Sequence, residues 1–277
     1  MATVWVNGEA TEKISVYDRA FTYGDGLFAT MAVDVAGKIQ FLSCHLQRLQ
    51  QGAARLGFHW HPSELLLSLL AETASRCPSH CLKLQLSRGN GGRGYMPPAE
   101  PQVTEVLSVS ALPAHYSKWR QQGIKLQTSA VTLAKQPLLA GIKHLNRLEQ
   151  VLIKSYPLPA GIDDWLVLDT DGKLVETSMA NLFLITETAQ GGWLALTPAI
   201  NYAGVSGVMR QQVIMALLAM NIDVQVQAVR RDCLSRVSHL FISNSLCGVV
   251  DIIGVDSYRY QPWSLSSQLR QHLAIQL

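Results

Sequence analysis

The sequence predicts an α+β protein in two parts, because strand-like and helix-like runs occur on both sides of one polar connection. With 277 residues, the chain is long enough to bury a large core in one large domain or two modest ones. The connection covers residues 111–123 and contains Pro113. We therefore expect an N-terminal domain at residues 1–112, a connection at 113–123 and a C-terminal domain at 124–277.

Turn residues and hydrophobic periodicity place the elements of the first part. Asn7-Gly8 follows a strand-like run, and this dipeptide supplies the positive φ angles of a tight hairpin. Ala36-Gly37 separates two further runs, and Ser43 is a plausible N-cap for a helix that ends at Gly57. The expected elements are strands at 4–6, 30–35, 38–41, 82–86 and 104–110, and helices at 43–57 and 62–74.

The second part alternates in the same way. An Asp-Gly turn at residues 171–172 joins two strand-like runs into a hairpin. A glycine-flanked start at residues 204–210 precedes an amphipathic helix. The expected elements are strands at 124–128, 165–168, 173–175, 181–185, 240–243 and 249–253, and helices after Lys143, near 208–218 and at the C-terminus.

The composition excludes several classes of protein. Hydrophobic residues make up 48% of the chain, charged residues 16%, and the net charge is +3. No run of five lysines or arginines occurs, so no nucleic-acid interface is expected, whereas a few arginines suffice for a small anionic substrate. The N-terminus lacks the basic start and apolar core of a secretory signal, and no run of 18 apolar residues predicts a membrane span.

Five cysteines are scattered along the chain, at positions 44, 77, 81, 233 and 247. An odd, dispersed set is typical of reduced thiols, so we expect a cytoplasmic protein. Cys77, His80 and Cys81 lie close together in the sequence. No second pair of ligands stands at a matching spacing, so no metal site is expected.

Lys143 is the residue around which a chemical hypothesis forms. It follows the small and apolar residues 138–142 and opens a segment in which Leu145, Leu148 and Leu152 recur at helical spacing. A lysine in such surroundings is easily desolvated, which lowers its pKa and makes the neutral amine available as a nucleophile. The alternative is a surface lysine at the start of an amphipathic helix.

Six segments, taken together, carry a resemblance to a known family. In chain order they are DRAFTYGDGLFAT (18–30), HLQRL (45–49), SRGNGGRGY (87–95), GIKHLNRLEQV (141–151), ETSMANLF (176–183) and GVSGVMR (204–210). The sequence resembles the aminodeoxychorismate lyase family, which consists of pyridoxal 5'-phosphate (PLP) enzymes of fold type IV. D-amino acid and branched-chain aminotransferases share that fold. The resemblance runs from about Asn7 to Asn244.

The resemblance implies a fold and a set of cofactor contacts. The fold would be a small N-terminal α/β domain and a larger C-terminal domain with a β-barrel-like sheet. Lys143 would hold PLP through its amine, and a carboxylate would keep the pyridine nitrogen protonated. Arginine suits a phosphate because its planar fork forms paired hydrogen bonds. The implied residues are Glu176 for the ring nitrogen, Asn181 for support of the ring, Arg48, Val205, Ser206 and Asn244 for the phosphate, and Thr30 for proton transfer.

The glycine-rich loop at residues 87–95 allows two interpretations. Gly89, Gly91 and Gly94 satisfy the spacing of a dinucleotide fingerprint, but Tyr95 and two prolines follow where a helix should begin. We prefer a substrate-binding loop in which Arg88 and Arg93 each face a carboxylate, with Tyr95 beside them. A flexible turn with exposed arginines is the alternative.

For activity, the resemblance implies conversion of 4-amino-4-deoxychorismate to 4-aminobenzoate and pyruvate in folate biosynthesis, by a cytoplasmic homodimer. An aminotransferase for D-amino or branched-chain amino acids would use the same lysine and glutamate. Branched-chain enzymes typically carry a tyrosine five residues after their lysine, whereas this chain has Leu148 there. A binding module that kept the fold and lost the cofactor is the alternative from another class.

Overall fold

The computed structural model describes residues 3–273, which divide into two compact units. Unit 1 contains residues 3–112 and the short segment Ile142–Arg147, and unit 2 contains Pro113–Gly141 and residues 148–273. We expected Ile142–Arg147 in the C-terminal domain. It belongs to unit 1 because its backbone pairs with a strand of that unit.

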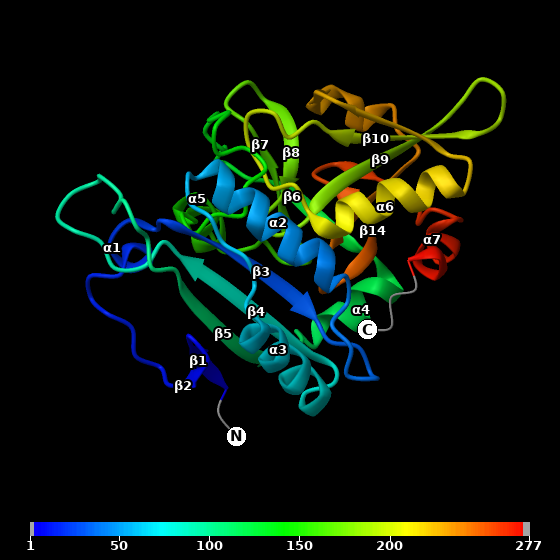
Figure 1. The fold of residues 1–277 in the computed structure, drawn as a ribbon. Helices are drawn as coiled ribbons and strands as arrows, with labels where there is room; N and C mark the ends of the chain where they lie inside the picture. Colours follow the sequence, from blue (N-terminus) through cyan, green and yellow to red (C-terminus); the bar gives the residue numbers. More distant parts are fainter. Residues whose placement is uncertain (1–2, 274–277) are drawn as a thin grey trace. The chain divides into compact units, whose positions relative to one another are not determined.

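Unit 1 is built on a five-stranded antiparallel sheet with strand order β2-β1-β5-β4-β3. Its helix α2 packs against β3, where Gly52 lies beside Leu27 (Figure 1). The three leucines of β4, Leu82, Leu84 and Leu86, alternate with Lys83 and Gln85 and all face the core, as their spacing predicts. The elements are β1 (Val4–Val6), β2 (Glu9–Ala10), α1 (Arg19–Tyr23), β3 (Gly26–Ala32), α2 (Leu42–Arg55), α3 (Glu64–Arg76), β4 (His80–Ser87) and β5 (Thr104–Ala111).

Three expectations for unit 1 need correction. Helix α2 begins before Ser43, and Phe41, with a φ of 53°, occupies the N-cap position without a side-chain hydrogen bond. The strand expected from Thr30 starts at Gly26. A Cβ on Gly26 would stand 2.1 Å from the Leu86 carbonyl oxygen, so only glycine allows β3 to pair this closely with β4. The returning strand at 38–41 is reduced to a single bridge between Val33 and Ile39.

Unit 2 contains a closed barrel-like sheet, as the resemblance implied. Six strands form the ring in the order β9-β13-β14-β6-β7-β8, and the pair Glu176 and Asn181 joins β8 back to β9. The remaining strands extend or flank this ring. The strands are β6 (Ile124–Thr128), β7 (Asp164–Leu168), β8 (Lys173–Thr177), β9 (Asn181–Glu187), β10 (Trp193–Pro198), β11 (Asp223–Gln227), β12 (Val229–Arg230), β13 (His239–Asn244), β14 (Gly248–Val255) and β15 (Tyr258–Arg259).

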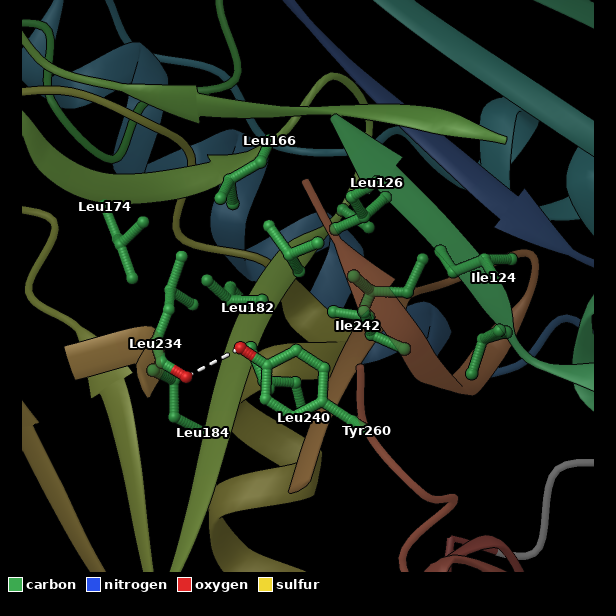
Figure 2. Close-up of a cluster of buried hydrophobic side chains, with 14 of the residues drawn as sticks. Ile124, Leu126, Leu166, Leu174, Leu182, Leu184, Leu234, Leu240, Ile242 and Tyr260 are labelled. Atoms are coloured by element: carbon green, nitrogen blue, oxygen red, sulfur yellow. Dashed lines mark hydrogen bonds between the residues drawn. The ribbon is translucent and has the colours of Figure 1, made fainter. Parts of the chain in front are cut away.

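The core of unit 2 fills this sheet with aliphatic side chains (Figure 2). Leu126, Leu166 and Leu182 come from three different strands and are completely buried. The Tyr260 hydroxyl donates to the Leu234 carbonyl oxygen at 2.7 Å, so this buried phenol has a hydrogen-bond partner (Figure 2).

The helices of unit 2 are α4 (His115–Gln122), α5 (Leu148–Ser155), α6 (Val208–Ala219) and α7 (Ser266–His272). Helix α4 stands where we expected a plain connection, and Tyr116 and Trp119 anchor it in the core. Helix α5 begins five residues after Lys143, and Leu148 and Leu152 are 77% and 54% exposed. The leucine periodicity therefore marks an exposed face and not the buried face of a helix that carries Lys143. No helix among residues 3–273 is both long and apolar enough to span a membrane.

Candidate active site

In unit 1, Lys143 lies on an extended segment that pairs with β3. The Phe28 N–H donates to the Lys143 carbonyl oxygen at 2.9 Å, and the Leu145 N–H donates to the Gly26 carbonyl oxygen at 2.9 Å. These two hydrogen bonds occupy backbone groups that a helix would use for its own hydrogen bonds. Helix α5 therefore starts only at Leu148. The Lys143 Nζ stands 4.4 Å from the centroid of the Phe28 ring, within the range of a cation–π contact.

Two arginines share this region of unit 1 with Lys143. The Arg147 guanidinium carbon is 5.7 Å from the same Phe28 ring, and Arg147 also donates to the His144 carbonyl oxygen at 2.8 Å. Burial, followed by the charge of Arg147, lowers the pKa of Arg48 on α2 to about 10. Lys143 and Arg147 lie near the Phe28 ring, and Arg48 lies on α2. These three cationic side chains provide hydrogen-bond donors that suit a phosphate or carboxylate group.

Two histidines in the same region are held in the neutral form. His45 on α2 is fully buried, and burial, then the charges of Arg48 and Lys143, lowers its pKa well below 6.5. Burial, then the charge of Arg147, lowers the pKa of His144 to about 4. A protonated imidazole in either place would add another cation to a region that already holds three.

These histidines predict a loss of stability in acid. Both have a lower pKa in the folded chain than in the unfolded chain, so the unfolded chain binds more protons as the pH falls below 6.5. Each histidine that stays neutral in the fold steepens the fall by up to about 1.4 kcal/mol per pH unit. In urea unfolding at pH 7.5, 6.0 and 5.0, roughly spanning the titration of a free imidazole, H45Q should show a shallower decline than the wild type.

The exposed His59 provides the control, and H59Q should decline as the wild type does. The comparison uses the slope against pH, so a constant loss of stability in H45Q does not affect it. Equal slopes in H45Q and the wild type would show that His45 does not contribute to acid sensitivity.

In unit 2, Glu176 lies on β8 at the point where the barrel closes. Its side chain is 6% exposed, and its Oε2 accepts a hydrogen bond from the Val205 N–H at 3.0 Å. The Asn181 Nδ2 lies 3.5 Å from the same oxygen and donates to the Val205 carbonyl oxygen at 2.9 Å. Asn181 and the Val205 backbone thus fix the orientation of a buried carboxylate.

One glycine lies against the Glu176 carboxylate and another against Asn181, which orients it. Gly204 has a φ of +87°, and a Cβ on it would stand 3.3 Å from the Glu176 Oε2. A Cβ on Gly207 would stand 2.1 Å from the Asn181 Oδ1. Larger residues at these positions would displace the groups that orient Glu176, so the GVSG sequence is needed by the carboxylate as well as by the start of α6.

The structure does not place the Val205 and Ser206 amides as predicted. The Val205 N–H is bonded to Glu176, and the Ser206 N–H donates to the Gly141 carbonyl oxygen at 3.1 Å. Neither amide is therefore available to a phosphate in this structure. The Asn244 Oδ1 accepts from the Leu246 and Cys247 N–H groups at 2.8 Å each, which closes a turn after β13.

We predicted that Arg88 faces a substrate carboxylate, but its guanidinium is hydrogen-bonded to other residues of unit 1. Its guanidinium donates to both carboxylate oxygens of Asp25, at 2.7 and 3.1 Å, and to the Leu56 carbonyl oxygen at 2.8 Å. The side chain is 8% exposed and its guanidinium carbon lies 4.8 Å from the Phe58 ring centroid. An arginine whose donors are engaged in this way has little capacity for a substrate carboxylate.

Of the other predicted residues of unit 1, two are exposed and Thr30 is half-buried. Arg93 and Tyr95 are exposed on the loop between β4 and β5. Thr30 lies two residues after Phe28 on β3, so both side chains are on the same face of the strand. Lys143, Thr30 and Arg48 thus belong to unit 1, whereas Glu176, Asn181, Val205, Ser206 and Asn244 belong to unit 2.

Sequence reasoning missed Phe28, His45 and Arg147 as parts of this site. All three lie inside the segments that carried the resemblance, which was the available signal, but burial and ring contacts become visible only in the fold. No group of three metal-ligating side chains occurs within residues 3–273.

The residues present fit the chemistry of PLP. In unit 1, a primary amine stands beside cations suited to a phosphate, and in unit 2 a buried, oriented carboxylate is suited to a protonated ring nitrogen. Gly204 leaves space beside that carboxylate, where a Cβ would stand 3.3 Å from its Oε2. Gly141 pairs with Val205 in unit 2, and only Ile142 separates it from Lys143 in the sequence.

Comparison with known proteins agrees with this chemistry. The chain is 32% identical to the aminodeoxychorismate lyase of Vibrio harveyi over 253 residues, which cover 91% of each chain. It is 26% identical to the D-alanine aminotransferase of Bacillus licheniformis, with 91% of this chain and 88% of the relative covered. The crystal structure of 4-amino-4-deoxychorismate lyase from Pseudomonas aeruginosa matches with a TM-score of 0.89 and 35% identity, covering 98% and 97% of the two chains.

The model of the class IV aminotransferase family matches residues 26–255, which include both groups of site residues. The chain therefore belongs to the class IV aminotransferase family and is a PLP-dependent enzyme with the type IV fold.

Proposed function

We propose that the protein is a lyase that converts 4-amino-4-deoxychorismate to 4-aminobenzoate and pyruvate. The observation that carries the proposal is the similarity to lyases of this name along almost the whole chain, at higher identity than to the D-alanine aminotransferase. The gathered cations of unit 1 support it, because the substrate is a dianion. A cytoplasmic location and a place in folate biosynthesis are part of the same proposal.

The cofactor-binding roles are assigned to residues of both units. When bound, PLP supplies an aldehyde that bonds to amines and a ring that withdraws electrons. We assign Lys143 to the covalent attachment, Arg48 to the phosphate and Glu176 to the ring nitrogen. Asn181 orients Glu176 through the contacts described above.

Lys143 also moves the proton in the proposed reaction. Its Nζ accepts the proton from the substrate carbon that bears the amino group. The bond between the neighbouring carbon and the enolpyruvyl oxygen breaks, its electron pair leaves with the oxygen as the enolate of pyruvate, and the CH2 carbon of that enolate takes up a proton to give pyruvate. The ring that remains is aromatic, so the elimination needs no oxidant. We assign Arg93 and Tyr95 to the substrate carboxylates, and Thr30 to a supporting role in proton transfer.

The direct test supplies the purified protein and PLP with freshly generated 4-amino-4-deoxychorismate. 4-Aminobenzoate and pyruvate are measured together, against an enzyme-free control. Equal formation of both products is the expected result. An absence of both products, with PLP still attached to the Lys143 peptide after borohydride reduction, would favour an aminotransferase instead, and D-amino and branched-chain donors would then be tested.

We also propose that the protein is a homodimer that buries the exposed face of α5. Leu148, Val151 and Leu152 are 77%, 56% and 54% exposed, and their spacing places them on one side of the helix. Large apolar side chains grouped in this way on a surface are typical of an interface.

A double substitution tests the dimer. L148E with L152E should shift the protein from dimer to monomer in light scattering, because charges would have to be buried in the interface. L218E places the same change at another exposed leucine, on α6, and should leave the dimer intact. A wild type that is monomeric, or a dimer that survives the double substitution, would contradict the proposal.

A further inference from the structure

The glycine-rich loop after β4 is held by one buried arginine. Arg19, at the start of α1, is 4% exposed. Its Nη2 donates to the Tyr95 carbonyl oxygen at 2.9 Å, and its Nη1 lies 3.4 and 3.3 Å from the carbonyl oxygens of Gly94 and Met96. Three successive carbonyl groups thus converge on one guanidinium. In Figure 1, the ribbon of this loop lies beside α1.

The Arg19 side chain is itself fixed in place. Its Nε donates to the Asp25 Oδ2 at 2.8 Å, and the same oxygen accepts from the Arg88 Nε at 2.7 Å. Burial opposes the charge on Asp25, but hydrogen bonds from Arg88 and Arg19 outweigh it and lower the pKa of Asp25. The Tyr23 ring centroid lies 4.8 Å from the Arg19 guanidinium carbon. Asp25 therefore links the first residues of the loop, through Arg88, to its middle, through Arg19.

Gly91 is part of this arrangement. A Cβ on Gly91 would stand 2.7 Å from the Arg19 Cδ, whereas a Cβ on Gly92 would meet nothing within 4 Å. Gly91 and Gly92 thus differ in the space available for a Cβ. Only Gly91 packs against the stem of the arginine, so its side of the loop cannot accept a methyl group without moving Arg19.

The side chains in the middle of the loop are exposed, although the centroid of the Tyr95 ring lies 5.4 Å from that of Tyr23. Arg93 is exposed, and Tyr95 and Met96 are 85% and 82% exposed, although the carbonyl oxygens of Tyr95 and Met96 are bonded to Arg19. The backbone is therefore held while the side chains stay accessible. A glycine-rich segment would otherwise lose much conformational entropy when it becomes ordered around a ligand.

We propose that Arg19 is a positioning residue that keeps this loop in the form in which Arg93 and Tyr95 meet the substrate. The inference rests on the proposed function, which assigns those two side chains to the substrate carboxylates. Arg19 does not touch the substrate. Its contribution is to hold the loop in place before binding, so that substrate binding does not have to order it.

Trypsin provides a readout that is independent of activity, because Arg93 is an exposed cleavage site within the loop. R19Q removes the guanidinium, and G91A displaces it while leaving it in the chain. Both should increase cleavage after Arg93 by about tenfold, the factor that corresponds to losing one hydrogen bond to a charged group. G92A is the matched control and should be cleaved at the wild-type rate. Fragments 1–93 and 94–277 are identified by mass.

Kinetics then separate positioning from general stability. R19Q and G91A should raise KM about tenfold with kcat within about twofold of the wild type, because the lost contacts orient the substrate-binding loop and not the reacting atoms. PLP content should stay unchanged. If R19Q does not fold, G91A still tests the inference. Wild-type cleavage rates or wild-type KM values in G91A would overturn it, whereas a wild-type protein without lyase activity would count against the proposed function alone.

Discussion

Replacing Lys143 with alanine is expected to reduce lyase turnover by roughly a thousandfold or more, the range found when a catalytic nucleophile is removed. The substitution deletes the amine that we assign both to PLP attachment and to proton removal. It leaves the backbone unchanged, so the Phe28 N–H still donates to the carbonyl oxygen of residue 143. The loss should therefore appear in kcat with the fold retained.

Three measurements identify the cause of that loss. Circular dichroism should be unchanged, and mass spectrometry after borohydride reduction should find PLP on the 143-containing peptide of the wild type only. K143R keeps a positive charge beside the Phe28 ring without a reactive primary amine, so it should be as inactive as K143A. K118A, at an exposed position on α4, is the control with full activity. Near-normal turnover by K143A would refute the assignment of Lys143.

The parts of the fold that the sequence predicted well are those set by local chemistry. Asn7-Gly8 makes the hairpin between β1 and β2, and the alternating leucines of β4 face the core as expected. Strand β6 has the predicted limits, Ile124–Thr128. Local chemistry did not predict the barrel, because its closure depends on the backbone pairing of Glu176 with Asn181. The barrel was expected only from the family resemblance.

The leucines after Lys143 show why periodicity can mislead. Their spacing does correspond to a helix, but α5 starts at Leu148, and the spaced leucines on it point outward. A periodic pattern predicts that one face is apolar and does not say what covers it. The strand-like pairing of Lys143 with β3 depends on a partner more than a hundred residues away, which no local pattern reveals.

Hydrogen-bond partners were the least predictable part of the site. Arg88 looked available for a substrate, yet its guanidinium donates to Asp25, which is 63 residues earlier. The Val205 N–H looked available for a phosphate, yet it donates to Glu176, which is 29 residues earlier. Residue types and spacing indicated which groups can bind anions. The fold decides which of those groups already have an internal partner.

Replacing Glu176 with glutamine is expected to lower kcat by roughly a hundredfold, the lower range for loss of a positioned proton-holding group. Glutamine has nearly the same shape and keeps an oxygen that can accept from the Val205 N–H, so the closure of the barrel should survive. What it removes is the negative charge. A neutral amide does not hold a proton on a ring nitrogen as a carboxylate does.

The decisive comparison is between E176Q and K143A. Since Glu176 is not assigned to covalent attachment, E176Q should still carry PLP on Lys143 after borohydride reduction, at near-wild-type stoichiometry, while its turnover is low. E187Q, at an exposed position at the end of β9, removes one negative charge without touching the site and should keep full activity. Full activity of E176Q would mean that the buried carboxylate serves the barrel alone. Low activity with PLP still attached would separate the two roles, with Lys143 binding the cofactor covalently and Glu176 controlling the charge of its ring.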